Sequence, residues 1–204
     1  MNLLALETAT EACSVALLRL GADGRREVIA RRRHAPRQQT ELILPMVDEV
    51  LAEGGLTLSA LDALAYSRGP GAFSGVRIAA AVTQGLALGA DLPVLPVSSL
   101  QALAQGAART QAADAVLASF DARMQEIYAG AFRCDADGLM WPLTAEVACR
   151  PEAVPEVLRT AWAELPDDLN TLGAGSGWAT YGERLAEALP VYLRDDVWKK
   201  LPGR

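Results

Sequence analysis

The sequence contains few of the residues that most often build catalytic sites. Its 204 residues include one histidine, His34, and three cysteines, Cys13, Cys134 and Cys149. A catalytic zinc site normally needs several His, Cys, Asp or Glu ligands at fixed spacings, and triad-type nucleophiles need a histidine base. Because His34 lies in an arginine-rich segment, we expect it at the surface. The odd number of cysteines, without a C-x-x-C pair, favours a reducing compartment over a disulfide framework.

Neither an excess of positive charge nor a long apolar run is present. The net charge is −6 and the pI about 4.9, which argues against a broad RNA-binding face. The longest apolar run, 78–90, is shorter than the roughly 20 residues that span a membrane, and no basic segment precedes Glu7 as in a signal peptide. One basic cluster fits a solvated hairpin edge or, as the alternative, an RNA-facing surface: Arg25, Arg26, Arg31, Arg32, Arg33 and Arg37.

Two parts of the chain share one plan. LLALETATEACSVALL, at 3–18, and AVLASFDARMQEIYAGAF, at 115–132, each read as an apolar strand, an acid, a polar turn and a second strand. This repetition predicts a duplicated α/β architecture with an N-terminal lobe (1–112) and a C-terminal lobe (113–204), each a mixed sheet covered by helices. Between the two repeats the patterns predict strands at 27–32, 62–67 and 93–97 and helices at 41–52, 75–88 and 99–110.

The stretch SRGPGAFSGVR, at 67–77, joins a predicted strand to a predicted helix, which is where many proteins bind phosphate. A P-loop needs Lys and Ser or Thr after its last glycine, but Val76 and Arg77 follow Gly75. The dinucleotide pattern G-x-G-x-x-G does not fit either, and Pro70 lacks an amide donor. We therefore predict a structural turn, with a phosphate site as the less favoured alternative.

The helix that follows this turn has no charged face. Small residues recur every fourth position at Gly75, Ala79, Thr83 and Ala87. A helix without charge on either side is not a solvent-covered surface helix, and small side chains permit close helix approach. One side can pack on its own sheet, and we expect the other to be covered by a second helix or chain. Burial wholly within this protein is the alternative.

These segments resemble a known protein family. The two repeats, the stretch ALAYSRGPGAFSGVRIAAAVTQGLALG and the tail VYLRDDVWKKLPG closely resemble the TsaB (YeaZ) family, over nearly the whole chain. Members are bacterial accessory subunits for making threonylcarbamoyladenosine in tRNA. The resemblance implies the duplicated actin-like/Hsp70-like ATPase (ASKHA, RNase H-like) fold, with two lobes of mixed sheet and covering helices.

The resemblance also implies a function without catalysis. The chain would bind TsaD, and through it TsaE, for threonylcarbamoyl transfer to the adenosine next to the anticodon of ANN-decoding tRNAs in the cytoplasm. It would contact tRNA only indirectly and form a homodimer when TsaD is absent. No cofactor would be bound tightly, although weak binding of ATP or ADP through the complex is expected. TsaD holds metal through an H-x-E-G-H motif, and Ser99 and Leu103 stand where its histidines would.

The predicted sites follow from the pattern and the resemblance together. The expected interface with TsaD comprises Leu42, Met46, Gly75, Ala79, Val82, Thr83 and Leu86. Weak nucleotide contacts are expected at Glu7, Thr8, Asp121, Gly173 and Gly175. Relatives usually carry Asp at the position of Glu7, and they have a further segment between the positions of Leu189 and Pro190. The rival functions are a small ATP-dependent kinase of the same fold and, less favoured, a metallopeptidase.

Overall fold

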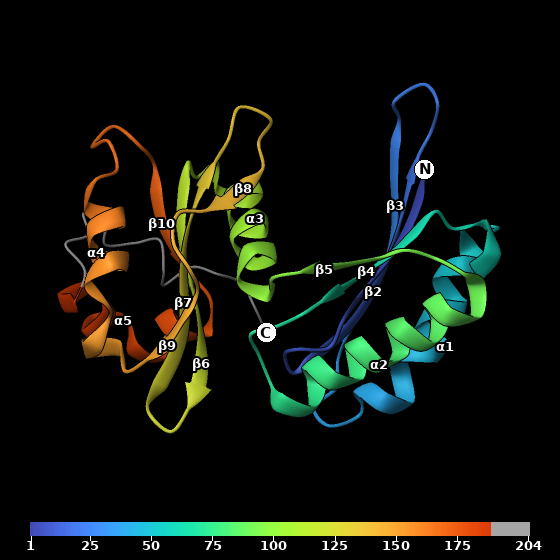
Figure 1. Ribbon diagram of the computed structural model, residues 1–204, viewed down its shortest axis with the longest axis horizontal. Helices are drawn as coiled ribbons and strands as arrows, with labels where there is room; N and C mark the ends of the chain where they lie inside the picture. The colour runs from blue at the N-terminus through green and yellow to red at the C-terminus, as the bar shows by residue number, and fades with distance from the viewer. Residues whose placement is uncertain (189–204) are drawn as a thin grey trace. The chain divides into compact units, whose positions relative to one another are not determined.

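The computed structural model describes residues 1–188 of the chain. The chain forms two compact units, the first from Met1 to Ser99 and the second beginning at Leu100. Each unit is an α/β lobe around one sheet (Figure 1). The boundary predicted between residues 112 and 113 lies at the other end of one helix, α3 (Ser99–Gln111), which packs with the second unit.

The first lobe is built on a five-stranded mixed sheet in the order β3-β2-β1-β4-β5. Its strands are β1 (Asn2–Glu7), β2 (Ala12–Leu20), β3 (Arg26–His34), β4 (Ala63–Ser67) and β5 (Val94–Val97). β1, β4 and β5 are parallel, whereas β2 is antiparallel to both of its neighbours. The parallel strands therefore end at one edge of the sheet, where β1 finishes with Glu7 and β4 with Ser67.

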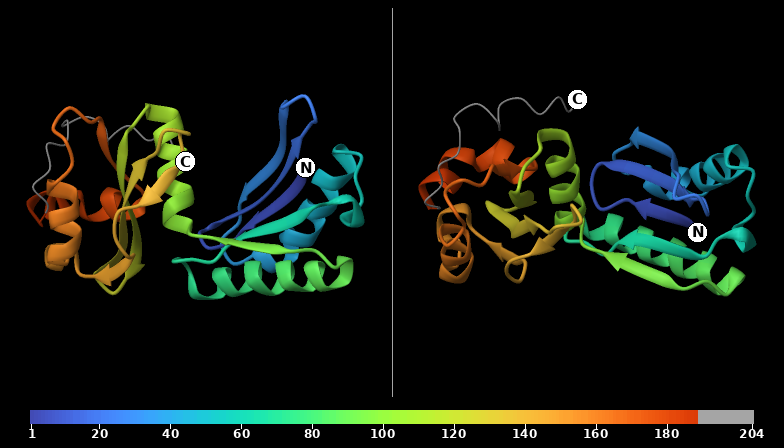
Figure 2. Two further views of the ribbon diagram at one scale, coloured as in Figure 1. Left: turned by 45° about the horizontal axis from the view of Figure 1, so that its top comes forward. Right: turned by 90° about the horizontal axis from the view of Figure 1, so that it is seen from above.

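Two helices cover one face of this sheet, α1 (Gln39–Glu53) and α2 (Phe73–Ala90) (Figure 2). One apolar stripe of α1 is buried and meets Leu4, Leu6 and Leu64 of the sheet in one core; it comprises Ile43, Met46, Val47, Val50 and Leu51. A short 3-10 turn, η1 (Leu58–Ala60), connects α1 to β4. Burial of one helical stripe against one face of a sheet is the packing that the amphipathic period of α1 predicts.

The loop between β4 and α2 packs directly on the turn between β1 and β2. A Cβ atom added at Gly75 would overlap the carbonyl oxygen of Thr8, and one added at Gly71 would lie 2.7 Å from the Cβ atom of Ala9. The Ala72 amide donates to the Ala9 carbonyl at 2.7 Å, and the Thr8 hydroxyl donates to the Gly75 carbonyl at 2.7 Å. Two backbones approach here as closely as glycine permits. The predicted structural turn is confirmed.

The second lobe repeats the hairpin and the parallel partner of the first. Its sheet has the order β10-β6-β7-β8, and β9 also pairs with β7. The strands are β6 (Ala115–Arg123), β7 (Glu126–Cys134), β8 (Met140–Pro142), β9 (Val147–Cys149) and β10 (Thr171–Ala174). β6 is antiparallel to β7 and parallel to β10, as β1 is to β2 and β4. The duplicated plan predicted from the two repeats is confirmed.

Helices cover both faces of the second sheet (Figure 1). α3 packs on one face around Leu100, Ala104 and Phe132, while α4 (Glu156–Ala163) and α5 (Ser176–Ala188) pack on the other around Trp162 and Trp178. A 3-10 turn, η2 (Pro151–Ala153), precedes α4. Within residues 1–188, no strand occupies beside β10 the place that β5 has beside β4. The segment predicted between residues 189 and 190 lies outside the described residues.

Gly75→Ala should destabilise the first lobe because the new methyl group would collide with backbone that cannot move away. Overpacking of this kind costs about 1–3 kcal/mol, and we expect a loss in this range in urea-induced unfolding.

The matched control is Gly85→Ala on the same helix, where an added Cβ meets no atom within 4 Å. It should stabilise the protein, by up to about 1 kcal/mol, through helix propensity alone. Equal effects of the two substitutions would contradict the packing argument.

Candidate functional site

Glu7, at the end of β1, is engaged by the protein itself. Its carboxylate accepts a hydrogen bond from the Ala9 amide, two residues further along the turn, and another from the Ser67 hydroxyl. Burial raises the pKa of Glu7, and these two hydrogen bonds partly oppose the shift. A carboxylate that already has two protein donors is poorly placed to hold a magnesium–phosphate complex as well.

The turn after Glu7 is equally occupied. The amide of Ala9 points at the Glu7 carboxylate, and the carbonyl of Ala9 accepts from Ala72 at the start of α2. Thr8 is buried, and its hydroxyl is bonded to Gly75. A phosphate group held at a helix N-terminus needs free amides with open space before them. Here the β1–β2 turn takes that space, so the predicted contacts at Glu7 and Thr8 do not form an open cradle.

In the second lobe the predicted contacts are filled by side chains. A Cβ atom added at Gly173 would lie 2.7 Å from the indole ring of Trp178, and one added at Gly175 would lie 2.7 Å from Leu103. The Trp178 indole N–H donates to the Leu117 carbonyl at 2.8 Å, which fixes the ring against the sheet. Packing therefore accounts for both glycines without a ligand.

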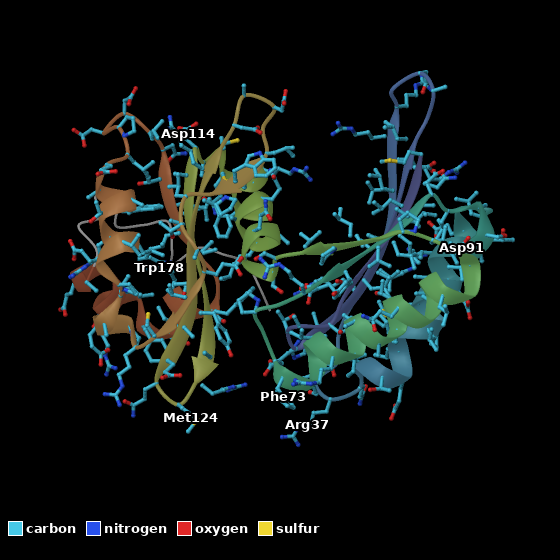
Figure 3. The ribbon with its side chains drawn as sticks, viewed as in Figure 1. Arg37, Phe73, Asp91, Asp114, Met124 and Trp178 are labelled. Atoms are coloured by element: carbon cyan, nitrogen blue, oxygen red, sulfur yellow. The ribbon has the colours of Figure 1, made fainter. Side chains whose placement is uncertain are left out.

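Asp121 ends the straight part of β6 and is half-buried. Its carboxylate accepts from the Arg123 amide at 2.8 Å, and its own amide donates to the Ser176 hydroxyl at 3.0 Å. The hairpin tip beyond it exposes Met124 (Figure 3). Asp121 thus joins β6 to the start of α5. Like Glu7, it is half-buried and its carboxylate accepts a hydrogen bond from a backbone amide two residues further along the chain.

Residues 1–188 contain no cluster of three or more His, Cys, Asp or Glu side chains that could hold a metal ion. His34 is exposed at the end of β3. Ser99 is buried and bonded to the Ser67 hydroxyl, and Leu103 lies against Gly175. Both residues therefore pack against neighbouring groups of the protein.

The predicted partner-binding helix α2 has two different stripes of small residues. Gly75, Ala79, Thr83 and Ala87 are buried against the sheet of their own lobe. Ala79 and Thr83 have no exposed surface. The predicted interface is corrected at Gly75, Ala79 and Thr83, because a partner cannot contact side chains that the sheet already covers.

The opposite side of α2 is open. Ala81, Gly85 and Gly89 form a second stripe at four-residue spacing, and all three are exposed. An added Cβ atom at Gly85 or Gly89 would meet nothing within 4 Å. Leu88 is 88% exposed beside this stripe, and Phe73 is 76% exposed at the start of the helix. Figure 3 labels Phe73 at one end of α2 and Asp91 at the other.

The N-terminal end of this open face is held in a fixed form. The guanidinium carbon of Arg77 lies 3.4 Å from the centre of the Phe73 ring, and Arg77 Nη1 donates to the Phe73 carbonyl at 2.9 Å. A stacked guanidinium is more rigid than a free arginine. We call the surface formed by Phe73, Arg77, Ala81, Gly85 and Leu88 the outer face of α2.

Helix α1 lies beside α2, and the remaining predicted interface residues on the two helices differ in their burial. Met46 is completely buried in the core, so the predicted interface is corrected there too. Leu42 of α1 and Val82 and Leu86 of α2 are partly buried and pack against the core. Leu44 is 48% exposed. These residues therefore keep apolar surface on α1 and α2 that is not fully buried in the core.

Two of the four arginines of β3, Arg31 and Arg33, are paired with carboxylates of α1. Arg31 pairs with Glu53 and lies 3.7 Å from Glu49, and Arg33 pairs with Glu49 at 2.7 Å. These pairs bind the outer strand to α1. The preferred interpretation, a charged hairpin edge, fits this arrangement better than an RNA-facing surface, because a phosphate backbone needs cations that are not already paired.

Among the described residues, α2 is the one helix whose length and composition would allow it to cross a membrane. A single helix of this kind is weak evidence, since core helices of globular proteins pass the same test. Its inner stripe is packed on a sheet.

Comparison with known proteins places the chain in a family. A family model described as TsaD, tRNA N6-adenosine threonylcarbamoyltransferase, matches residues 28–153. The tRNA threonylcarbamoyladenosine biosynthesis protein TsaB of Haemophilus influenzae is 41% identical over 245 residues, covering 100% of this chain and 98% of that protein. TsaB of Escherichia coli is 41% identical over 239 residues and is covered completely, as is this chain. Both alignments are longer than the chain, so both relatives carry residues without a counterpart here.

Solved structures agree. YeaZ from Pseudomonas aeruginosa superposes with a TM-score of 0.77 at 43% identity, covering 95% of this chain and 83% of that one. An uncharacterized Pseudomonas aeruginosa protein with similarity to peptidase YeaZ gives a TM-score of 0.80 at 44% identity, covering 90% and 79%. The predicted duplicated actin-like/Hsp70-like ATPase fold is confirmed. The chain belongs to the TsaB (YeaZ) family of tRNA threonylcarbamoyladenosine biosynthesis proteins.

Proposed function

We propose that this chain is a non-catalytic subunit that binds TsaD in the cytoplasm and supports threonylcarbamoyl transfer to the adenosine next to the anticodon of ANN-decoding tRNAs. The observation that carries the proposal is the outer face of α2, which is uncharged from Ala81 to Leu88 and whose exposed residues have open space before Gly85 within the described part of the chain. TsaE joins through TsaD, and tRNA is contacted indirectly. Without TsaD, the same face pairs with a second copy of the chain.

The geometry of the outer face favours a helix as its counterpart. Gly85 and Gly89 leave a shallow strip along α2, and Leu88 rises beside it. Small residues let two helix axes come close, so that the ridges of one helix enter the groove of the other. A standard interface buries about 800 Å² on each partner and depends on a few well-packed positions. Phe73, Leu88 and Leu44 are the exposed apolar side chains available for this role.

We further propose that the chain binds nucleotide only weakly. The proposal rests on Glu7, whose carboxylate is bonded to Ala9 and Ser67, and on the packing of Gly173 and Gly175. ATP or ADP would then be held mainly by the complex. The kinase alternative needs an open phosphate loop and free acids in both lobes, whereas the carboxylates of Glu7 and Asp121 both accept hydrogen bonds from backbone amides of the chain.

Gly85→Arg should weaken docking without harming the fold. The site is exposed and open, and arginine is a better helix former than glycine. At an interface its charge would be desolvated without a counter-ion. We expect TsaD binding, measured by calorimetry, to weaken at least about tenfold, which corresponds to about 1.4 kcal/mol. Threonylcarbamoylation in a reconstituted reaction should fall with it.

Gly106→Arg is the matched control, because Gly106 is also an exposed helical glycine with open space around it, on α3. It should bind TsaD normally. Ala79→Arg should instead unfold the first lobe, since Ala79 is fully buried. If Gly85→Arg melts like the wild type, binds TsaD normally and supports modification, docking uses another surface.

Elemental analysis after purification without chelator should find no stoichiometric zinc or iron.

Titration of the isolated chain with ATP and magnesium should give a dissociation constant well above micromolar and no phosphate release. Glu7→Gln should leave the heat of ATP binding unchanged in this titration, because the Glu7 carboxylate faces protein donors. Micromolar affinity with steady hydrolysis would favour the kinase alternative.

A further inference from the structure

Four groups form a continuous hydrogen-bonded network at the edge where the parallel strands of the first lobe end. The Ala9 amide and the Ser67 hydroxyl both donate to the Glu7 carboxylate. The Ser67 hydroxyl is in turn bonded to the Ser99 hydroxyl. This network runs from the end of β1 across the end of β4 to the first residue of α3, so it links three elements that lie far apart in the sequence.

Ser99 stands where the polypeptide leaves the first unit, which ends at this residue. Two backbone hydrogen bonds hold the same exit segment. The Arg68 amide donates to the Val97 carbonyl at 2.8 Å, and the Ser99 amide donates to the Gly69 carbonyl at 2.9 Å. The position of the first residue of α3 is therefore fixed both by the loop after β4 and by a side chain from the end of β4.

The two hydroxyl groups in this network are buried and need a terminal acceptor. Ser67 is 6% and Ser99 4% exposed. Each hydroxyl donates once and accepts through its lone pairs, whereas an ionised carboxylate only accepts. If Glu7 accepts from Ser67, then Ser67 accepts from Ser99, and every donor has a defined direction. Without the carboxylate, Ser67 would lose its acceptor in a buried setting, where an unsatisfied polar group is unfavourable.

We propose that Glu7 is a positioning residue that, through Ser67, anchors the exit of the chain from the first lobe at Ser99. The carboxylate at the end of β1 acts on the protein's own hydroxyl groups in place of a bound ion. This inference does not depend on the partner that the outer face of α2 binds. It assigns a role to an acid that the proposed function leaves without one.

Amide hydrogen exchange measured by NMR on the full chain tests the anchor. The reporters are the amides of Ser99 and Arg68, which are bonded across the exit segment. In Glu7→Ala and in Ser67→Ala, both amides should exchange about fivefold faster, the factor expected when one ordinary hydrogen bond is lost. Glu7→Gln keeps an acceptor oxygen and should restore most of the protection.

Ser14→Ala is the matched control. Ser14 lies directly opposite Glu7 on β2 and is half-buried, so its loss should leave both amides protected. Ser99→Ala removes only the last hydroxyl group of the network. It should speed the exchange of the two amides while the melting temperature stays near that of the wild type, which keeps the test valid if Glu7→Ala fails to fold.

The double variant Glu7→Ala/Ser99→Ala separates an anchor from two independent losses. If the groups act as one network, the exchange rates in the double variant should equal those of the faster single variant. They should not rise by the product of the two single-variant acceleration factors. Multiplicative effects, unchanged exchange in Ser67→Ala and Ser99→Ala, or equal acceleration in Ser14→Ala would each overturn the proposal. A change in TsaD binding with unchanged exchange would bear on the proposed function and would count against the anchor.

Discussion

The first lobe depends on the contact between two backbones, the β1–β2 turn and the start of α2. Gly71 and Gly75 permit this contact because any side chain there would meet Thr8 or Ala9. Once the start of α2 is fixed, the four-residue repeat places Ala79, Thr83 and Ala87 against the sheet. The other side of the helix is then necessarily outside. The surface proposed to bind TsaD is thus a consequence of a glycine contact at one end of the helix.

The same contact alters the chemistry of an ATPase-like fold. The turn after the first strand and the acid at its end were the positions at which weak nucleotide contacts were predicted. Here the turn supports α2, and Glu7 accepts hydrogen bonds from Ala9 and Ser67. The second lobe reaches a similar result by different means, since Trp178 and Leu103 fill the space beside its glycines. In both lobes, the predicted nucleotide-contact residues are thus engaged by neighbouring protein groups.

The sequence predicted the elements of the first lobe well and the roles of α2 only in part. Alternation and helical period locate the strands and α1, because burial on one side follows directly from those periods. For α2 they fail. The stripe through Ala79 and the stripe through Gly85 are both small and uncharged, so composition cannot tell which one faces the sheet. The contact of Gly75 with Thr8 decides this, and it joins residues 67 positions apart. The network from Glu7 to Ser99 was likewise beyond prediction, because isolated serines carry no pattern.

The two stripes of α2 answer to different physical demands. On the inner stripe, small residues are required by the fold, since the sheet lies against them. On the outer stripe, a Cβ atom added at Gly85 or Gly89 would meet no atom of residues 1–188 within 4 Å, and each glycine in a helix interior is less favourable than alanine by about 1 kcal/mol. The fold of the lobe offers no compensation for that loss. Close approach of another helix does, because only there does the missing side chain permit contact that alanine or leucine would prevent. The energetic disadvantage of these glycines in the isolated chain therefore supports the proposal that the outer face docks a partner.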